Sequence, residues 1–145
     1  MSASYYVLLV EDSLADAELA RVAIGRASLD VEVGHANTGD EARLLLDEVL
    51  ARGAGPRAML ILLDLNLPGT DSLALLEEWK SSPRTRVLPV VAFSGTSDPS
   101  LAHRVLDLHA NAFVPKTGEV EQFMERVRCV TEAFLLYACM PLARH

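Results

Sequence analysis

The chain has 145 residues, half of them apolar, which fits a globular protein with one sizeable core and excludes a disordered chain. Its formal net charge of -7 argues against a surface for nucleic acid or for an anionic membrane, so we expect neither as a partner. The N-terminal residues show no signal peptide, and no apolar run is long enough to cross a bilayer, so we expect a cytoplasmic protein.

The N-terminal half alternates strand patterns with helix patterns. Apolar residues 7–10 predict a strand, and Ser13 is placed to cap a helix that runs to about Arg26. Alternation at 31–33 predicts a second strand. Thr38 and Glu41 then have the spacing of a capping box ahead of apolar residues at helical intervals.

The continuous apolar run at 59–63 predicts a third strand that is covered on both faces. Leu75, Leu76 and Trp79 lie on one side of a third helix, which must end before Pro83. A fourth strand is predicted at 90–93, a fourth helix around 101–108, a short fifth strand at 112–114 and a long last helix from about Glu119 towards Tyr137. Five successive strand–helix units predict an α/β fold, a doubly wound parallel sheet with helices on both faces.

Four of the predicted strands end in polar side chains. Glu11 and Asp12 follow the first strand, Asp64 ends the third, Ser94 ends the fourth and Lys116 follows the fifth. The carboxyl ends of parallel strands meet at one edge of the sheet, where ligands bind. Three carboxylates there would repel one another unless a hard cation such as Mg²⁺ joined them, and a lysine with a hydroxyl could hold phosphate oxygens. The pattern therefore predicts a magnesium-dependent phosphoryl-transfer site.

These residues resemble the motifs of a response-regulator receiver domain. The resemblance is carried by Glu11-Asp12, by Asp64 with 66–69, by Ser94-Gly95 and by 112–116, and it covers about residues 6–128. It implies a flavodoxin-like sheet with strand order 2-1-3-4-5 and five helices, the last of them extended. We expect one receiver domain over 1–145, with a C-terminal helical extension at about 129–145.

The resemblance also implies a role for each site residue. Asp64 would be the phosphoacceptor, taking its phosphoryl group from a phosphohistidine on a sensor histidine kinase. Lys116 would contact the phosphoryl group, Ser94 would move towards it, and Phe113 would follow as a rotameric switch. Mg²⁺ would be held by four residues, the last through its backbone carbonyl: Glu11, Asp12, Asp64 and Asn66.

Shorter segments are similar to the stand-alone regulators that accompany phytochromes. The segments are 62–68, 108–113 and the apolar tail 134–142. This narrower similarity implies that the partner is a phytochrome-type, light-sensing histidine kinase.

Two positions depart from the usual receiver pattern. Ser72 stands where glycine is common after Asp71; the serine can cap the helix that follows, and Asp71 is a second candidate for that cap. Thr117 stands where a proline usually follows the lysine, so we expect a trans bond and a differently aimed Lys116 loop.

The end of the last helix, residues 133–140, is apolar almost all round, although a surface helix needs only one apolar stripe. We expect a homodimer through this segment, with part of the fourth helix. The alternative is that the segment folds back onto its own domain.

Three functions compete at this stage. The leading hypothesis is a signalling relay with no enzyme activity beyond its own phosphorylation and dephosphorylation. The second is a Mg²⁺-dependent phosphohydrolase that uses Asp64 as nucleophile. Enzymes resembling haloacid dehalogenases usually carry a second aspartate two residues on, where this chain has Asn66. The third is a phosphorylation-independent adaptor. The presence of the acidic pair, of Asp64 and of Lys116 argues against this third function.

Overall fold

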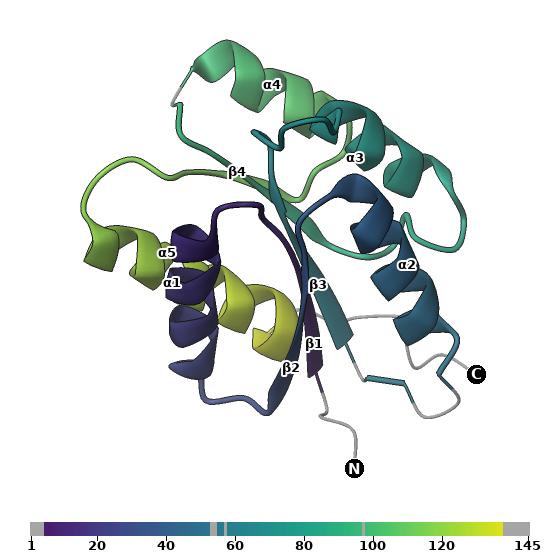
Figure 1. Cartoon of the computed structure of the whole chain (residues 1–145), viewed down its shortest axis with the longest axis horizontal. Helices are drawn as coiled ribbons and strands as arrows, with labels where there is room; N and C mark the ends of the chain where they lie inside the picture. Colours follow the sequence, from purple (N-terminus) through teal and green to yellow (C-terminus); the bar gives the residue numbers. More distant parts are fainter. Residues whose placement is uncertain (1–4, 53–54, 57, 97, 138–145) are drawn as a thin grey trace.

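A five-stranded parallel sheet forms the centre of the molecule (Figure 1). The computed structural model describes residues 5–52, 55–56, 58–96 and 98–137. The strands are β1 (Tyr5–Val10), β2 (Val31–Ala36), β3 (Ala58–Asp64), β4 (Val90–Ser94) and β5 (Ala112–Pro115). Their order, β2-β1-β3-β4-β5, confirms the predicted flavodoxin-like topology.

Helices cover both faces of this sheet. The α-helices are α1 (Leu14–Gly25), α2 (Gly39–Leu50), α3 (Ser72–Ser81), α4 (Pro99–Asp107) and α5 (Val120–Glu132). The helices α1 and α5 pack with Val7, Leu9, Leu60 and Leu62 on one face. The helices α2, α3 and α4 pack with the alternate strand residues on the other face.

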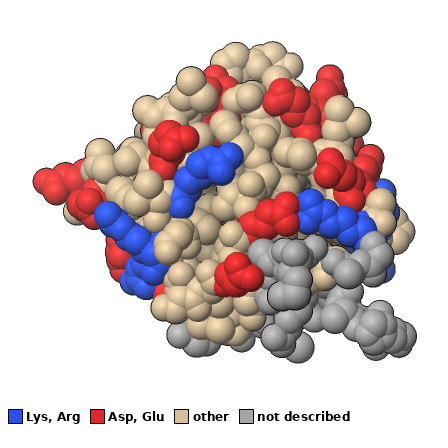
Figure 2. All heavy atoms as spheres, turned by 60° about the horizontal axis from the view of Figure 1, so that its bottom comes forward, with Lys and Arg blue, Asp and Glu red and all other residues tan. Residues whose placement is uncertain are grey.

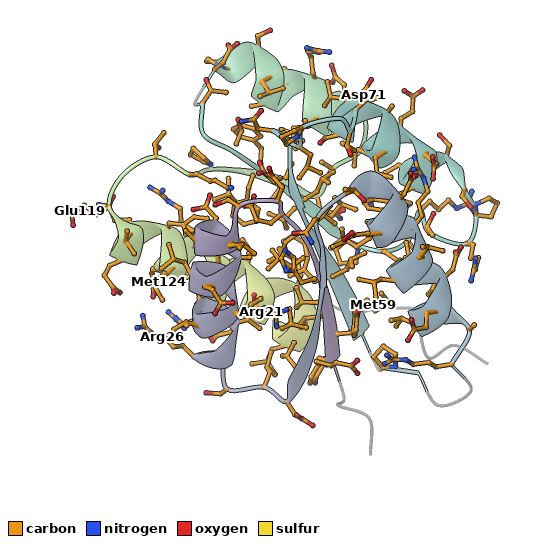
Figure 3. The ribbon with its side chains drawn as sticks, in the orientation of Figure 1. Arg21, Arg26, Met59, Asp71, Glu119 and Met124 are labelled. Atoms are coloured by element: carbon orange, nitrogen blue, oxygen red, sulfur yellow. The ribbon has the colours of Figure 1, made fainter. Side chains whose placement is uncertain are left out.

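Every residue of β3 is buried, as expected for a strand covered on both sides. Successive side chains of a strand point to opposite faces, so β3 contributes to both cores. Figure 3 shows Met124 of α5 beside α1, and Met59 of β3 on the side of α2. The central strand therefore holds Asp64, its last residue, in a rigid position at the sheet edge.

Side-chain caps fix where α1, α2 and α3 begin. The Ser13 hydroxyl accepts from the Asp16 N–H, and the Asp71 carboxylate accepts from the Ala74 N–H. Thr38 caps α2 as predicted, but the predicted capping box is wrong, because the Glu41 carboxylate accepts from the N–H of Asn37 instead. These caps set the direction of the loops that join the strand ends to α1 and α3.

The C-terminal end differs from the continuous helix that the sequence predicts. The α-helix ends at Glu132 and continues as a π-helical segment, η1 (Ala133–Tyr137). Leu135 of η1 is buried in the α1–α5 side of the core, whereas Leu136 is 43% exposed. This segment thus folds partly onto its own domain, as the alternative required. Residues 138–145, which include the remainder of the apolar tail 134–142, lie outside the described residues.

The surface carries charges of both signs. On the face shown in Figure 2, basic side chains lie beside acidic ones rather than in a continuous basic patch. Within the described part of the chain, no helix is both long and apolar enough to cross a membrane.

Candidate functional site

Three carboxylates meet at the carboxyl edge of the sheet. Carboxylate oxygens of Glu11, Asp12 and Asp64 all lie within 4.8 Å of one another. The strands β1 and β3 are adjacent and in register, so Val10 pairs with Leu63 and the acidic residues that follow are neighbours. Glu11 and Asp64 are buried, whereas Asp12 is exposed. A set of oxygen donors with one side open to solvent fits Mg²⁺, which favours carboxylates and retains water.

Lys116 supplies the positive charge of the site. Its Nζ lies 3.3 Å from Asp64 Oδ2 and 2.9 Å from Asp16 Oδ2, and it donates to Glu11 Oε1. The backbone N–H of Lys116 donates to the Ser94 carbonyl at 2.6 Å, which ties the β5–α5 loop to the end of β4. One ammonium therefore faces three carboxylates.

The Lys116–Thr117 bond is trans, as expected, since the described residues contain no cis peptide bond. With this trans bond, the Lys116 ammonium still reaches Asp64. Arg126 of α5 stabilises this loop from outside: its Nη1 donates to the Thr117 carbonyl at 2.6 Å and to the Pro115 carbonyl at 3.2 Å. An arginine on the next helix thus holds the segment that carries the lysine.

The crowding of like charges changes the acidity of Glu11. Burial and the neighbouring Asp64 carboxylate together raise the pKa of Glu11 to about 7, although Lys116 lowers it. Burial alone would lower the pKa of Lys116, but its hydrogen bonds to Glu11 and Asp16 outweigh burial and raise that pKa above its usual range. The site therefore has more negative charge than one lysine can balance.

The remaining predicted site residues lie around this cluster. The Asn66 N–H donates to Asp64 Oδ1 at 3.0 Å. Ser94 is buried at the end of β4, where its hydroxyl accepts from the Thr96 N–H, and it does not cap α4, whose cap is Asp98. Phe113 of β5 is half-buried and packs against the core on the α2–α4 side. An open cleft of about 260 Å³ is lined by Glu11, Asp12, Ser13, Asp16, Asp64, Asn66, Pro68, Gly95 and Lys116.

Ser72 has a different role from the one predicted. Asp71 caps α3, and the Ser72 hydroxyl donates to the backbone carbonyl of Asp64 at 3.0 Å. Ser72 is buried, so this bond satisfies a carbonyl at the end of β3 away from water. The serine thereby fixes the backbone of Asp64.

Sequence reasoning missed two contributors to the site. Asp16 lies in the first turn of α1, and its carboxylate contacts Lys116. Nothing in the sequence pattern around Arg126 indicates a role at the site, since Arg126 lies outside the apolar stripe of α5. Both residues contact elements that are distant in sequence. The residue spacing within one element does not reveal such contacts.

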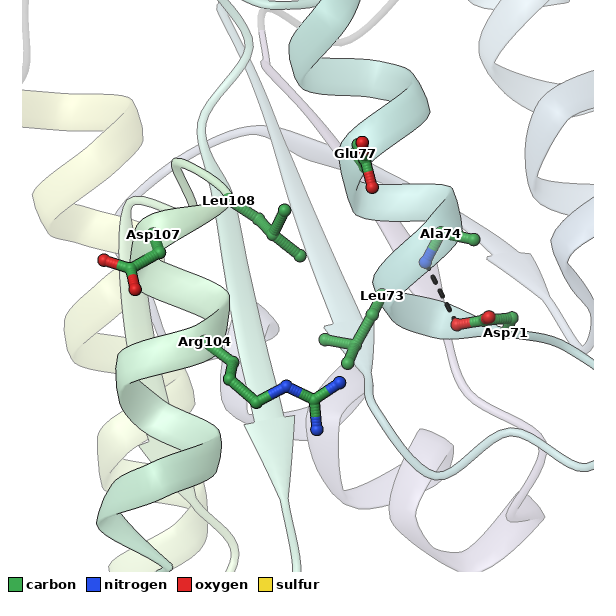
Figure 4. A pocket seen from close by; sticks show the side chains of 7 residues that line it. All are labelled: Asp71, Leu73, Ala74, Glu77, Arg104, Asp107 and Leu108. Atoms are coloured by element: carbon green, nitrogen blue, oxygen red, sulfur yellow. Dashed lines mark hydrogen bonds between the residues drawn. The ribbon is translucent and has the colours of Figure 1, made fainter.

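A second hollow, of about 390 Å³, lies between α3 and α4 (Figure 4). Arg104 extends from α4 towards the start of α3, near Leu73 and Asp71. None of the predicted site residues lines this groove, so it is separate from the acidic cluster.

Comparison with known proteins gives one consistent answer. The family described as the response regulator receiver domain matches residues 7–128. Response regulator Rcp1 from Synechocystis sp. is 30% identical over 137 residues, which cover 94% of this chain and 93% of Rcp1.

Two solved structures share the fold at nearly full length. The phosphorylated cyanobacterial phytochrome response regulator RcpA has a TM-score of 0.82 and 33% identity, over 94% of this chain and 97% of RcpA. The Mn²⁺-bound form of Rcp1 has a TM-score of 0.80 and 29% identity, over 94% of this chain and 98% of Rcp1.

Proposed function

The chain belongs to the response regulator receiver domain family, and on this premise we propose that it accepts a phosphoryl group on Asp64 from a sensor histidine kinase. The observation that carries the proposal is the convergence of Glu11, Asp12 and Asp64 with Lys116 at one edge of the sheet. Asp64 is the member of this cluster that ends a fully buried strand and faces the lysine.

The proposed reaction is a direct transfer between two side chains. A carboxylate oxygen of Asp64 attacks the phosphorus of a phosphohistidine on the kinase. A new O–P bond forms as the P–N bond breaks, and the imidazole nitrogen keeps the electron pair and takes up a proton. Lys116 is placed to donate hydrogen bonds to the phosphoryl oxygens, because its Nζ lies 3.3 Å from Asp64 Oδ2.

The residues at the site fit the metal that this reaction needs. When bound by Glu11, Asp12, Asp64 and the backbone carbonyl of Asn66, Mg²⁺ would offset the negative charge of the phosphoryl group. The oxygen donors within 4.8 Å of one another support this assignment.

We further propose that Ser94 and Phe113 report phosphorylation to the surface. The Ser94 hydroxyl at the end of β4 would move to the phosphoryl group, and Phe113 on the neighbouring strand would change rotamer. The half-buried position of Phe113 supports this, since such a ring can alternate between the core and the surface.

We propose a phytochrome-type histidine kinase as the partner. Support comes from the similarity to RcpA, which is described as a phytochrome response regulator, over nearly the full length of both chains. Light-dependent phosphotransfer from a purified phytochrome kinase, with none from an unrelated histidine kinase under the same conditions, is the expected result.

Incubation with acetyl phosphate and Mg²⁺, followed by intact mass spectrometry, tests the phosphoacceptor function. A labile phosphoryl adduct is expected on the wild-type protein and not on Asp64→Asn. Steady turnover of small phosphate esters would indicate a phosphohydrolase instead. A folded protein that forms no adduct would indicate an adaptor.

A further inference from the structure

Lys116 has one carboxylate partner that the proposed metal site does not use. Asp16 Oδ2 lies 2.9 Å from the Lys116 Nζ, closer than Asp64 Oδ2 at 3.3 Å. Among the described residues, the acidic group that could hold a metal ion consists of Glu11, Asp12 and Asp64, and Asp16 is not a member. Lys116 is therefore shared between the reacting carboxylate and a carboxylate outside the metal cluster.

Asp16 is held in place by its helix. Its backbone N–H donates to the Ser13 hydroxyl, the cap that starts α1. The Ser13 N–H in turn lies 3.3 Å from Glu11 Oε2. Because α1 packs against α5 in the core, the Asp16 backbone cannot follow the lysine if the lysine moves. Only the side chains adjust, and the Asp16 carboxylate is partly exposed, so water can replace the lysine.

An ammonium group has three hydrogen-bond donors; that of Lys116 donates to Glu11 and Asp16 and forms an ion pair with Asp64. A phosphoryl group on Asp64 adds up to two negative charges and three strong acceptor oxygens next to the same ammonium. Asp16 and these oxygens then compete for the donors and the charge of Lys116.

We propose that Asp16 is a positioning residue that keeps Lys116 partly engaged on the α1 side and thereby weakens the phosphorylated state. This inference rests on the proposed function of Asp64. It adds that the occupancy of the phosphorylated state is set by a carboxylate that touches neither the metal cluster nor the phosphoryl group. Removing the charge of Asp16 should strengthen binding of a phosphoryl group at Asp64.

Beryllofluoride, which mimics a phosphoryl group on aspartate, provides an equilibrium test in saturating Mg²⁺. Asp16→Asn and Asp16→Ala should each bind it about twofold to fivefold more tightly than the wild type, the range for one partly exposed charge. Glu18→Gln is the matched control, because it removes one negative charge from an exposed position of the same helix and should change nothing.

A double-mutant cycle with Lys116→Met separates this role from a merely structural one. The gain from Asp16→Asn should vanish in the Lys116→Met background, because the effect passes through the lysine. An unchanged or weakened affinity in both Asp16 variants, or an equal gain without Lys116, overturns the proposal. If the wild type itself binds no beryllofluoride, both the phosphoacceptor function of Asp64 and the role of Asp16 are contradicted. If the wild type binds it normally and the Asp16 variants show no gain, only the role of Asp16 is contradicted.

Discussion

Among the site carboxylates, Glu11 has the environment that most opposes its negative charge. It is almost completely buried, its carboxylate oxygen lies within 4.8 Å of one from Asp64, and among the described residues Lys116 is the cation that contacts it. Burial and Asp64 together raise its pKa to about 7. In the metal-free protein it therefore carries a proton for part of the time near neutral pH, and a cation that uses its oxygen must displace that proton.

The affinity for Mg²⁺ should consequently increase with pH. Because the Glu11 pKa is about 7, the apparent affinity should rise by about tenfold between roughly pH 6 and pH 8. A fluorescence or calorimetric titration at both pH values measures it. Glu11→Gln should bind more weakly and with a much flatter pH profile. A wild-type affinity that is equal at both pH values would contradict the raised pKa.

The sequence indicated the main charges of the site but not their network. Glu11, Asp12, Asp64 and Lys116 were predictable because each follows a strand, and parallel strands end at one edge. Asp16 lies inside a helix, and only the packing of α1 against α5 brings it to Lys116. Ser72 was assigned to the wrong partner because a hydroxyl at a helix start fits a cap equally well.

At the scale of elements, the β5–α5 loop shows how a local departure is accommodated. Thr117 leaves the loop without the restricted φ that proline imposes. Arg126 replaces that restriction with two hydrogen bonds, to the carbonyls of Pro115 and Thr117. The charged side chain of α5 thus takes part in aiming Lys116.

Arg126→Ala should therefore slow phosphorylation of Asp64 by acetyl phosphate, by about threefold or more, because a looser loop holds Lys116 less often in place. Arg128→Ala is the matched control: it removes an arginine two residues along α5 whose ion pairs are with Glu125 and Glu132 of the same helix and not with the loop. Initial rates from intact mass spectra compare the variants. Equal rates for both variants would show that Arg126 does not position the loop.

The element order was predictable because each strand and helix has its own hydrophobic periodicity and its own boundary residues. The run 59–63 is wholly apolar, and Pro83 limits α3. The end of α5 was not predictable in the same way. Residues 133–137 have the composition of a continued α-helix, and the turn to π geometry accompanies the burial of Leu135 against the sheet core. Tertiary packing, rather than local propensity, decides that end.

At the scale of the whole molecule, the apolar side chains of the C-terminal segment differ in their burial. Leu135 is buried in the core of its own domain, and Leu136 is 43% exposed. On the α4 face, Leu106 is 47% exposed. These exposed leucines support the proposal of a homodimer through the C-terminal segment and α4.

Leu136→Glu should shift the oligomeric state towards the monomer, because a carboxylate would be desolvated at the interface. Light scattering across a range of protein concentrations, with and without acetyl phosphate, measures this shift. Leu44→Glu on α2 is the matched control, since Leu44 is 71% exposed and lies outside the proposed interface. A wild-type protein that stays monomeric at high concentration in both states would contradict the dimer.

We propose that the charged groups at the carboxyl edge of the sheet serve one nucleophile, Asp64. Reduction with borohydride after incubation with acetyl phosphate and Mg²⁺ tests it most directly, since hydride converts an aspartyl phosphate into homoserine at the modified position. Peptide mapping by mass spectrometry should find homoserine at position 64 alone, and none when Mg²⁺ is removed with a chelator. Homoserine at position 12 instead, or at no position in a folded protein, would contradict the account.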